Sequence, residues 1–169
     1  MEKIELFQIK TEAYQPYGDL LSAAGAGVFA NEGNADKFVD QAELCNLREN
    51  AQPKLSVFRC APKTENPLPI KFLERHEHST QVFIPMGGAK RFLAVVALGG
   101  DAPDLSTLKA FWVGPAQGIS YRPGVWHAPM TVLDVPTDMA CFVYEDGTAA
   151  DCEMFELKTP LFLDIPEGP

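Results

Sequence analysis

Short β-rich runs recur along most of this chain and constrain its fold more than any other feature. They are KLSVFRCA (54–61), IKFLERHEH (70–78), TQVFIPM (80–86), FLAVVALG (92–99), LKAFWVG (108–114), GISYR (118–122), MTVLDV (130–135), MACFVYED (139–146) and CEMFELK (152–158). Pro, Gly or Asp residues separate them at intervals of roughly 8–12 residues, which is typical of antiparallel sandwiches and barrels. We therefore predict a mainly β fold, a double-sheet jelly-roll barrel.

Few segments favour helix. DQAELCNL (Asp40–Leu47) is expected to form a short helix, and PDLSTLKAF (103–111) a helical turn that leads into a strand. The chain of 169 residues contains no evident linker, repeat or break in composition, so we expect a single domain over residues 1–169.

Charge and composition exclude several classes of function. The formal net charge of −9 argues against a nucleic-acid partner, because phosphate binding requires an excess of Lys and Arg. No apolar run approaches the roughly 20 residues of a membrane helix, and the first ten residues lack the apolar core of an export signal. The four cysteines form no C-x-x-C pair. We expect a cytoplasmic protein with reduced thiols and no membrane partner.

The three histidines, His76, His78 and His127, lie in two short segments. Side chains alternate along a strand, so Glu74, His76 and His78 would share one face. The turn in RPGVWHAP could bring His127 to the same place. Imidazole nitrogen suits zinc, nickel, iron or copper. The pattern predicts a metal site formed by the three histidines.

These segments resemble the two-part motif of the cupins, H-x-H followed by Glu and Gly, and then P-x-G-x-x-H. His76 and His78 match the first half, and Gly124 and His127 keep the G-x-x-H spacing. Gln81 stands near the Glu position, and the proline directly precedes Gly124. The resemblance implies a cupin-type double-stranded β-helix.

Each residue also has an ordinary structural interpretation. His78 could be a solvated turn residue, His76 and His127 could be satisfied inside the core, and Trp126 could be a core side chain. Glu74 and Arg75 could form a surface ion pair.

A more specific resemblance covers roughly residues 7–156. ERHEHSTQVFIPM, VVALGGDAPDLSTLKAF and QGISYRPGVWHAPM occur in this order, together with YGDL, NEG and TDMACFVYEDG. In this combination the chain resembles the ureidoglycolate lyase family. That implies a cupin-type fold, commonly homodimeric, which cleaves ureidoglycolate to glyoxylate and urea in allantoin and purine catabolism. It also implies a nickel cofactor, although zinc or another divalent metal is not excluded by the ligand types.

The resemblance assigns site residues by position. Arg75, His76, Gln81 and His127 match the family pattern, whereas the position of His78 varies. We expect catalytic roles for His76, His127, Arg75 and Gln81, and substrate contacts from Asn31, Ser79, Trp126 and Tyr121. The metal ligands are then His76, His78 and His127, or His76 and His127 with Gln81 or Glu74, or the reaction needs no tightly bound metal.

Two other functions fit the same histidines. One is another metal-dependent cupin enzyme, a dioxygenase or isomerase, and the other is a cupin that binds a small molecule without turning it over.

Overall fold

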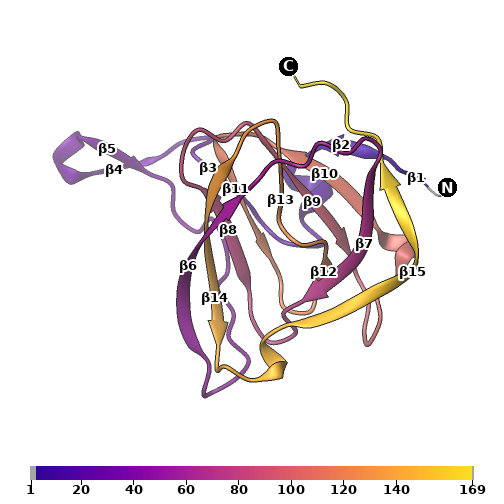
Figure 1. Ribbon diagram of the computed structural model, residues 1–169. Coiled ribbons are helices and arrows are strands. Elements are labelled where there is room, and N and C mark those ends of the chain that lie inside the picture. Colours follow the sequence, from indigo (N-terminus) through magenta and orange to yellow (C-terminus); the bar gives the residue numbers. More distant parts are fainter. Residues whose placement is uncertain (1–2, 169) are drawn as a thin grey trace.

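The β-rich runs form strands that assemble into two main sheets with a shared core between them (Figure 1). The computed structural model describes residues 3–168. The larger sheet contains β1 (Lys3–Ile4), β2 (Leu6–Gln8), β7 (Leu68–Arg75), β9 (Arg91–Ala97), β10 (Lys109–Val113), β12 (Trp126–His127), β13 (Thr131–Leu133) and β15 (Glu153–Leu163). The smaller sheet contains β3 (Leu20–Ser22), β6 (Gln52–Cys60), β8 (Gln81–Pro85), β11 (Gln117–Tyr121) and β14 (Thr137–Glu145). The predicted mainly β, cupin-type jelly-roll barrel is confirmed.

Strand β9 shows why the longest apolar run of the sequence is uninterrupted. Every residue of the strand is buried. Phe92, Ala94 and Val96 contribute to the core between the sheets. Leu93, Val95 and Ala97 contribute to a second apolar cluster with residues of β7 and β15. A strand covered on both faces needs apolar side chains at all positions rather than at alternate ones.

A small hairpin projects from the barrel, formed by β4 (Val28–Ala30) and β5 (Ala35–Lys37) (Figure 1). Its turn is the 3₁₀ segment η1 (Asn31–Gly33), in which Asn31 and Glu32 have positive φ values of 49° and 57°. The sequence runs that predicted the barrel did not predict this hairpin.

The remaining helical segments are short: α1 (Thr11–Tyr14), η2 (Leu105–Thr107) and η3 (Ala149–Asp151). The expected helical turn before β10 is confirmed, because η2 begins after Asp104, whose side chain accepts a hydrogen bond from the Ser106 amide. Within the described residues no helix is long and apolar enough to cross a membrane.

The predicted helix over Asp40–Leu47 is wrong. This segment is irregular, apart from a bridge between Asn46 and Ser79, and its backbone bonds to the turn that follows β7. The Leu47 amide donates to the His78 carbonyl over 2.8 Å, and the Thr80 amide donates to the Cys45 carbonyl over 3.0 Å. These long-range bonds replace the internal hydrogen bonds of a helix, so tertiary pairing overrides the local pattern.

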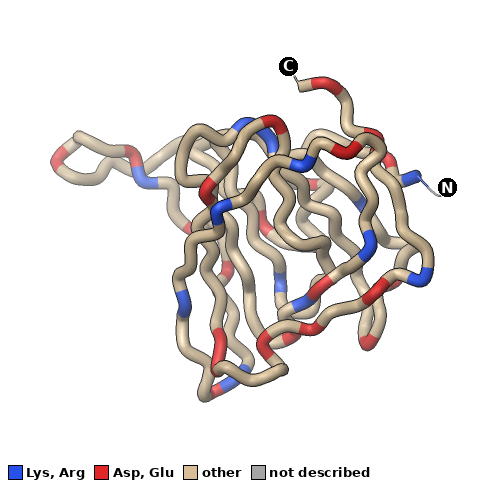
Figure 2. Tube along the Cα trace, viewed as in Figure 1, with Lys and Arg blue, Asp and Glu red and all other residues tan. Residues whose placement is uncertain are grey.

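Charged residues of both signs are distributed along the whole chain trace (Figure 2). All four cysteines are free thiols, and burial raises the pKa of the Cys141 thiol to about 12. A thiol with such a pKa stays protonated at neutral pH and behaves as a small core residue.

Candidate active site

Three side chains with ligand-type atoms converge where β7 and β12 lie side by side. Glu74 is in β7, His76 follows the end of β7, and His127 pairs with Glu74 in the register of the two strands. Their ligand atoms all lie within 4.8 Å of one another. His127 is 1% exposed and His76 is 8% exposed. The rings of the two histidines stack with centroids 5.8 Å apart.

Both imidazole rings are anchored in the same way. Nδ1 of His76 lies 2.6 Å from the Asp151 carbonyl oxygen, and Nδ1 of His127 lies 3.0 Å from the Val125 carbonyl oxygen. A carbonyl can only accept, so each Nδ1 must carry a proton. In the neutral rings Nε2 then has a free lone pair. Both Nε2 atoms are buried and have no hydrogen-bond partner among residues 3–168.

The carboxylate of Glu74 sets the charge of this cluster. Its Oε1 lies 3.6 Å from Nε2 of His127, which is longer than a hydrogen bond. Burial acts to raise the pKa of Glu74, but the neighbouring His127 and His76 lower it below its ordinary value. Burial and the nearby His127 lower the pKa of His76. At neutral pH the cluster therefore holds a charged carboxylate and a neutral His76.

Two further buried polar groups lie beside the cluster. The Tyr121 ring stacks on His127 with centroids 4.0 Å apart, and Gln81 pairs with Tyr121 across β8 and β11. The Tyr121 hydroxyl and Oε1 of Gln81 are buried without a hydrogen-bond partner in the described part of the chain. Burial raises the pKa of Tyr121 well above its ordinary value, so this hydroxyl remains a proton donor. The structure thus brings His76, His127 and Tyr121 together, and it places Gln81 opposite Tyr121 on the neighbouring strand.

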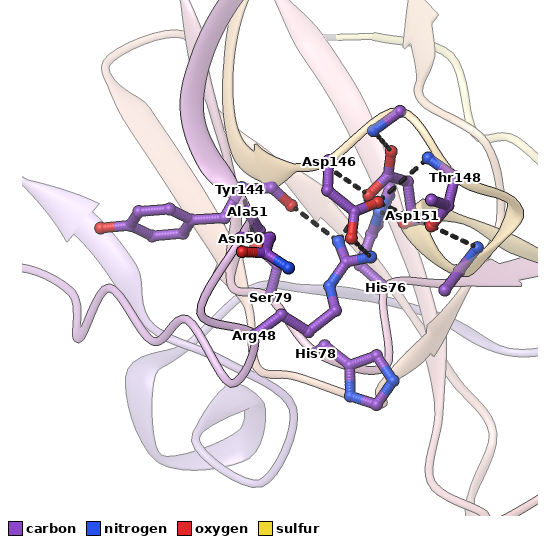
Figure 3. A network of polar contacts seen from close by, with 12 residues as sticks. Arg48, Asn50, Ala51, His76, His78, Ser79, Tyr144, Asp146, Thr148 and Asp151 are labelled. Atoms are coloured by element: carbon purple, nitrogen blue, oxygen red, sulfur yellow. Dashed lines mark hydrogen bonds and ion pairs between the residues drawn. The ribbon is translucent and has the colours of Figure 1, made fainter.

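His78 does not share a face with Glu74 and His76, contrary to the alternation expected from the sequence. Strand β7 ends at Arg75, and residues 77–78 form a turn. The His78 ring is about one-third exposed and faces Glu77, with Nε2 3.6 Å from its carboxylate. Figure 3 shows this ring apart from the polar contacts around Asp151. The cluster contains Glu74 in the place predicted for His78.

Arg75 and Trp126 lie on the opposite side of their strands, as their parity requires. The Arg75 guanidinium contacts Glu153 over 2.7 Å, donates to the Gly100 carbonyl over 2.6 Å and lies 4.7 Å from the centre of the Trp126 ring. Nε1 of Trp126 donates to the same Gly100 carbonyl. These groups are occupied by protein contacts away from the cluster.

The remaining two predicted substrate contacts lie elsewhere. The Ser79 hydroxyl accepts from the Tyr144 amide and donates to the Thr80 carbonyl, so it serves the backbone. Asn31 is exposed in the turn of the projecting β4–β5 hairpin (Figure 1). The structure does not bring either of them into the cluster.

Sequence reasoning missed the groups that hold His76 in place. Asp151 contacts His76 through its backbone carbonyl, and Arg48 contacts the Asp151 carboxylate over 2.5 Å. No motif marks such a contact, because every residue carries a carbonyl. The one available signal was the charge complementarity of Arg48 with the Asp-rich segment EDGTAAD.

The chain is similar to known proteins along its whole length. A sequence model of the family described as ureidoglycolate lyase matches residues 1–164. Ureidoglycolate lyase of Burkholderia cepacia is 35% identical over 160 residues, which cover 94% of this chain and 88% of the relative. Ureidoglycolate lyase of Escherichia coli O1:K1 / APEC is 37% identical over 153 residues, which cover 90% and 92%.

Among solved structures, a dTDP sugar isomerase of Desulfovibrio desulfuricans G20 has a TM-score of 0.49 and 17% identity, covering 83% of this chain and 85% of the other.

Proposed function

The chain belongs to the ureidoglycolate lyase family, and we propose that it cleaves ureidoglycolate into glyoxylate and urea at the cluster of Glu74, His76 and His127. One observation carries the assignment of the site: two buried imidazoles offer free Nε2 atoms beside a carboxylate. The reaction is a carbon–nitrogen cleavage of the amidine-lyase type, and we propose that it belongs to the breakdown of allantoin and purines, which the name of the family implies.

The substrate defines what the site must do. Ureidoglycolate carries a hydroxyl group and a ureido nitrogen on the carbon next to its carboxylate. Cleavage removes the hydroxyl proton, forms the carbonyl of glyoxylate as the carbon–nitrogen bond breaks, and delivers one proton to the departing nitrogen. One base and one acid are sufficient, and no net proton is consumed.

The histidine pair is suited to these two transfers. His76 is neutral at pH 7 because its pKa is lowered, so its Nε2 can accept the hydroxyl proton. To act as an acid, His127 must carry a proton on Nε2 in addition to the one on Nδ1, and the Glu74 carboxylate, 3.6 Å from Nε2, would pair with the positive ring that results. We assign the base role to His76 and the acid role to His127. The carbonyl groups that anchor both Nδ1 atoms keep the rings in place during the transfer.

The same three side chains fit a divalent cation. They offer two imidazole nitrogens and a carboxylate oxygen, and each ring is oriented by a hydrogen bond at its other nitrogen, as is usual for metal ligands. We propose nickel, following the family resemblance; the ligand types also suit zinc. When bound, the cation would lower the pKa of the substrate hydroxyl. Metal binding and proton transfer are alternative uses of the same Nε2 atoms.

Tyr121 and Gln81 are assigned to substrate binding. A buried polar group without a partner costs free energy, and a ligand that pairs with it recovers that cost. The Tyr121 hydroxyl stays protonated and would donate to a substrate oxygen. Oε1 of Gln81 would accept a hydrogen bond from a ureido N–H group.

We propose supporting roles for the other predicted residues. Arg75 and Trp126 stabilise the outer side of β7 and β12, and Ser79 holds the turn after β7. Asn31 is assigned no role in the cluster, because it lies in η1, the turn of the β4–β5 hairpin that projects from the barrel (Figure 1). His78 is proposed to be dispensable for metal binding.

We further propose that the chain is a single domain that acts as a cytoplasmic homodimer, as the family resemblance implies. The smaller sheet supports dimerisation, because Leu55 and Val57 of β6 and Ile84 of β8 are exposed apolar side chains.

Product analysis tests the proposed function. The purified protein, before and after metal removal by a chelator, is incubated with freshly prepared ureidoglycolate, and glyoxylate, urea and ammonia are followed against the spontaneous rate. We expect glyoxylate and urea in equal amounts with little ammonia. Ammonia in place of urea would mean amidohydrolase chemistry. A rate equal to background in both samples would contradict the proposal and favour a different cupin substrate or a binding protein.

A further inference from the structure

The turn between β14 and β15 is built on two aspartates. The Asp151 carboxylate accepts hydrogen bonds from the backbone amides of Asp146 and Gly147, over 2.9 and 2.7 Å. The Asp146 carboxylate accepts from the amide and hydroxyl of Thr148, over 3.0 and 2.6 Å. These contacts fix the short segment that carries the Asp151 backbone carbonyl, which is the group that holds His76.

Arg48 reaches into this turn from another part of the chain (Figure 3). Its Nη2 lies 2.5 Å from the Asp151 carboxylate, and its Nη1 lies 3.1 Å from the Asp146 carboxylate. The Arg48 side chain is only 15% exposed, so water screens these contacts little. A single guanidinium thus neutralises the two carboxylates on which the turn is built.

Asp151 is therefore held on two sides. Its carboxylate contacts Arg48, and its backbone carbonyl lies 2.6 Å from Nδ1 of His76. Displacement of the carboxylate would move the carbonyl, because both belong to the same residue in a short 3₁₀ segment. Nδ1 of His76 would then lose the acceptor that keeps its proton there.

The segment that carries Arg48 also contacts the chain just beyond His76. The neighbouring Leu47 amide donates to the His78 carbonyl, and Asn46 pairs with Ser79. The segment around Arg48 therefore contacts both the acceptor of the His76 ring and the backbone that follows this histidine. Through these two contacts the segment around Arg48 links Asp151 to the chain that follows His76, although the three are far apart in sequence.

We infer that Arg48 is a positioning residue: by holding Asp151, it keeps His76 in the Nδ1–H tautomer and leaves Nε2 free for the reaction or for a metal. The expected effect of Arg48 on catalysis rests on the proposed function. Its expected effect on the tautomer of His76 does not depend on that function. His127 provides an internal comparison, because its Nδ1 bonds to the Val125 carbonyl two residues earlier and no contact links it to Arg48.

NMR spectroscopy reports the tautomer of His76 directly. The chain has only three histidines, so long-range ¹H–¹⁵N correlation spectra of the metal-free, ¹⁵N-labelled protein resolve each ring, with H76Q and H127Q giving the assignments. The spectra are recorded at pH 8, above the ordinary imidazole pKa of about 6.5. In the wild-type protein we expect His76 and His127 as Nδ1–H tautomers. In R48Q we expect the His76 signals to move toward the Nε2–H pattern and those of His127 to stay unchanged.

A matched control removes a different buried Arg–Asp pair. Arg91 contacts Asp134 over 2.7 Å, with the Arg91 side chain 7% exposed. R91Q removes a comparable ion pair and should leave the His76 signals unchanged. R48K, which keeps the charge but not the planar fork, should give an intermediate spectrum. If R48Q does not fold, D151N provides the same reading, because it weakens the contact to Arg48 and keeps the backbone carbonyl.

Steady-state kinetics provide a second test of the role of Arg48. We expect R48Q to lower kcat by about 10- to 100-fold, as is typical when a group that orients a catalytic or metal-bound histidine is lost, with a smaller change in KM. A folded R48Q or D151N whose His76 keeps the wild-type tautomer would overturn the inference. A wild-type protein without turnover, but with a His76 tautomer that responds to R48Q, would instead contradict the proposed function and leave the inference standing.

Discussion

The Tyr121 ring lies almost parallel to the His127 ring, with centroids 4.0 Å apart and an angle of 8° between the planes. Both side chains are buried, so the tyrosine covers one face of the imidazole and limits its rotation. The same tyrosine presents its unpaired hydroxyl beside the cluster. One side chain thus combines a packing role and a polar role, and two substitutions separate them.

Y121F keeps the stacked ring and removes the hydroxyl. We expect it to fold with nearly wild-type stability, because the removed group has no partner in the protein, and to raise KM if the hydroxyl binds substrate. Y121A also removes the ring and should destabilise the protein by about 3–5 kcal/mol, as large buried aromatic side chains do. Urea unfolding and steady-state kinetics of both variants test this. Equal KM values for Y121F and wild type would exclude a substrate contact of the hydroxyl.

The two buried histidines should be far more sensitive to substitution than the third. H76A and H127A should each lower kcat by about 10²- to 10⁴-fold, the usual contribution of a general acid or base. H78A should keep wild-type kcat, because this ring lies in the turn after β7 and faces Glu77. Full turnover in both H76A and H127A would remove the proposed mechanism. A large loss in H78A would restore this residue as a candidate ligand.

Metal binding provides a measurement that does not depend on turnover. E74Q removes the only carboxylate of the cluster and keeps the shape of the side chain. We expect it to lower the affinity for Ni²⁺ and Zn²⁺, measured by calorimetry on the chelator-treated protein, with little change in the far-UV circular dichroism spectrum. H78A serves as the matched control and should bind as tightly as wild type. Equal affinities of E74Q and wild type would show that Glu74 is not a ligand.

The lowered pKa of His76 gives stability a defined dependence on pH. The unfolded chain takes up a proton at this residue near pH 6.5, whereas the folded protein resists protonation to lower pH because the ring is buried beside His127. The contribution of the neutral His76 ring to the free energy of unfolding is therefore complete above about pH 6.5. It decreases as the pH falls toward the folded pKa, by at most about 1.4 kcal/mol per pH unit. H76Q should flatten this part of the curve of unfolding free energy against pH. Parallel curves for wild type and H76Q would contradict the assigned shift.

Much of the barrel follows from patterns that act over a few residues. Residues 92–97 of β9 are all apolar because both faces of the strand are covered, and the Asp104 cap precedes the turn before β10. The segment Asp40–Leu47 has a pattern compatible with helix, yet its backbone pairs with residues 78–80. Such pairing depends on where the end of β7 lies in space, and local sequence does not carry that information.

The candidate site likewise contains parts that could be predicted from the sequence and parts that could not. The proximity of His76 and His127 could be inferred from the spacing of the motifs, because each follows or occupies a strand of one sheet. The position of His78 could not be inferred, because β7 ends at Arg75, three residues before His78, and side chains alternate only along a strand. The role of Arg48 was also hidden, since it acts through a backbone carbonyl that any residue at position 151 would provide.

Arg75 allows a direct test between binding substrate and supporting the fold. Its guanidinium already contacts Glu153, the Gly100 carbonyl and the Trp126 ring, so it has little capacity left for a substrate carboxylate. R75A should lower the free energy of unfolding by roughly 2 kcal/mol or more, because it removes charge-assisted hydrogen bonds and exposes the indole. The KM for ureidoglycolate should stay close to the wild-type value.

E153Q is the matched variant for this test. It removes the charge that Arg75 contacts, and Glu153 is half-exposed, so the loss of stability should be smaller than in R75A. Urea unfolding gives both values, and initial rates over a range of ureidoglycolate concentrations give KM. A KM raised tenfold or more in R75A, with wild-type KM in E153Q, would show that Arg75 binds the substrate. An unchanged KM in both variants, together with lower stability in R75A, would assign this arginine to the support of β7 and β12.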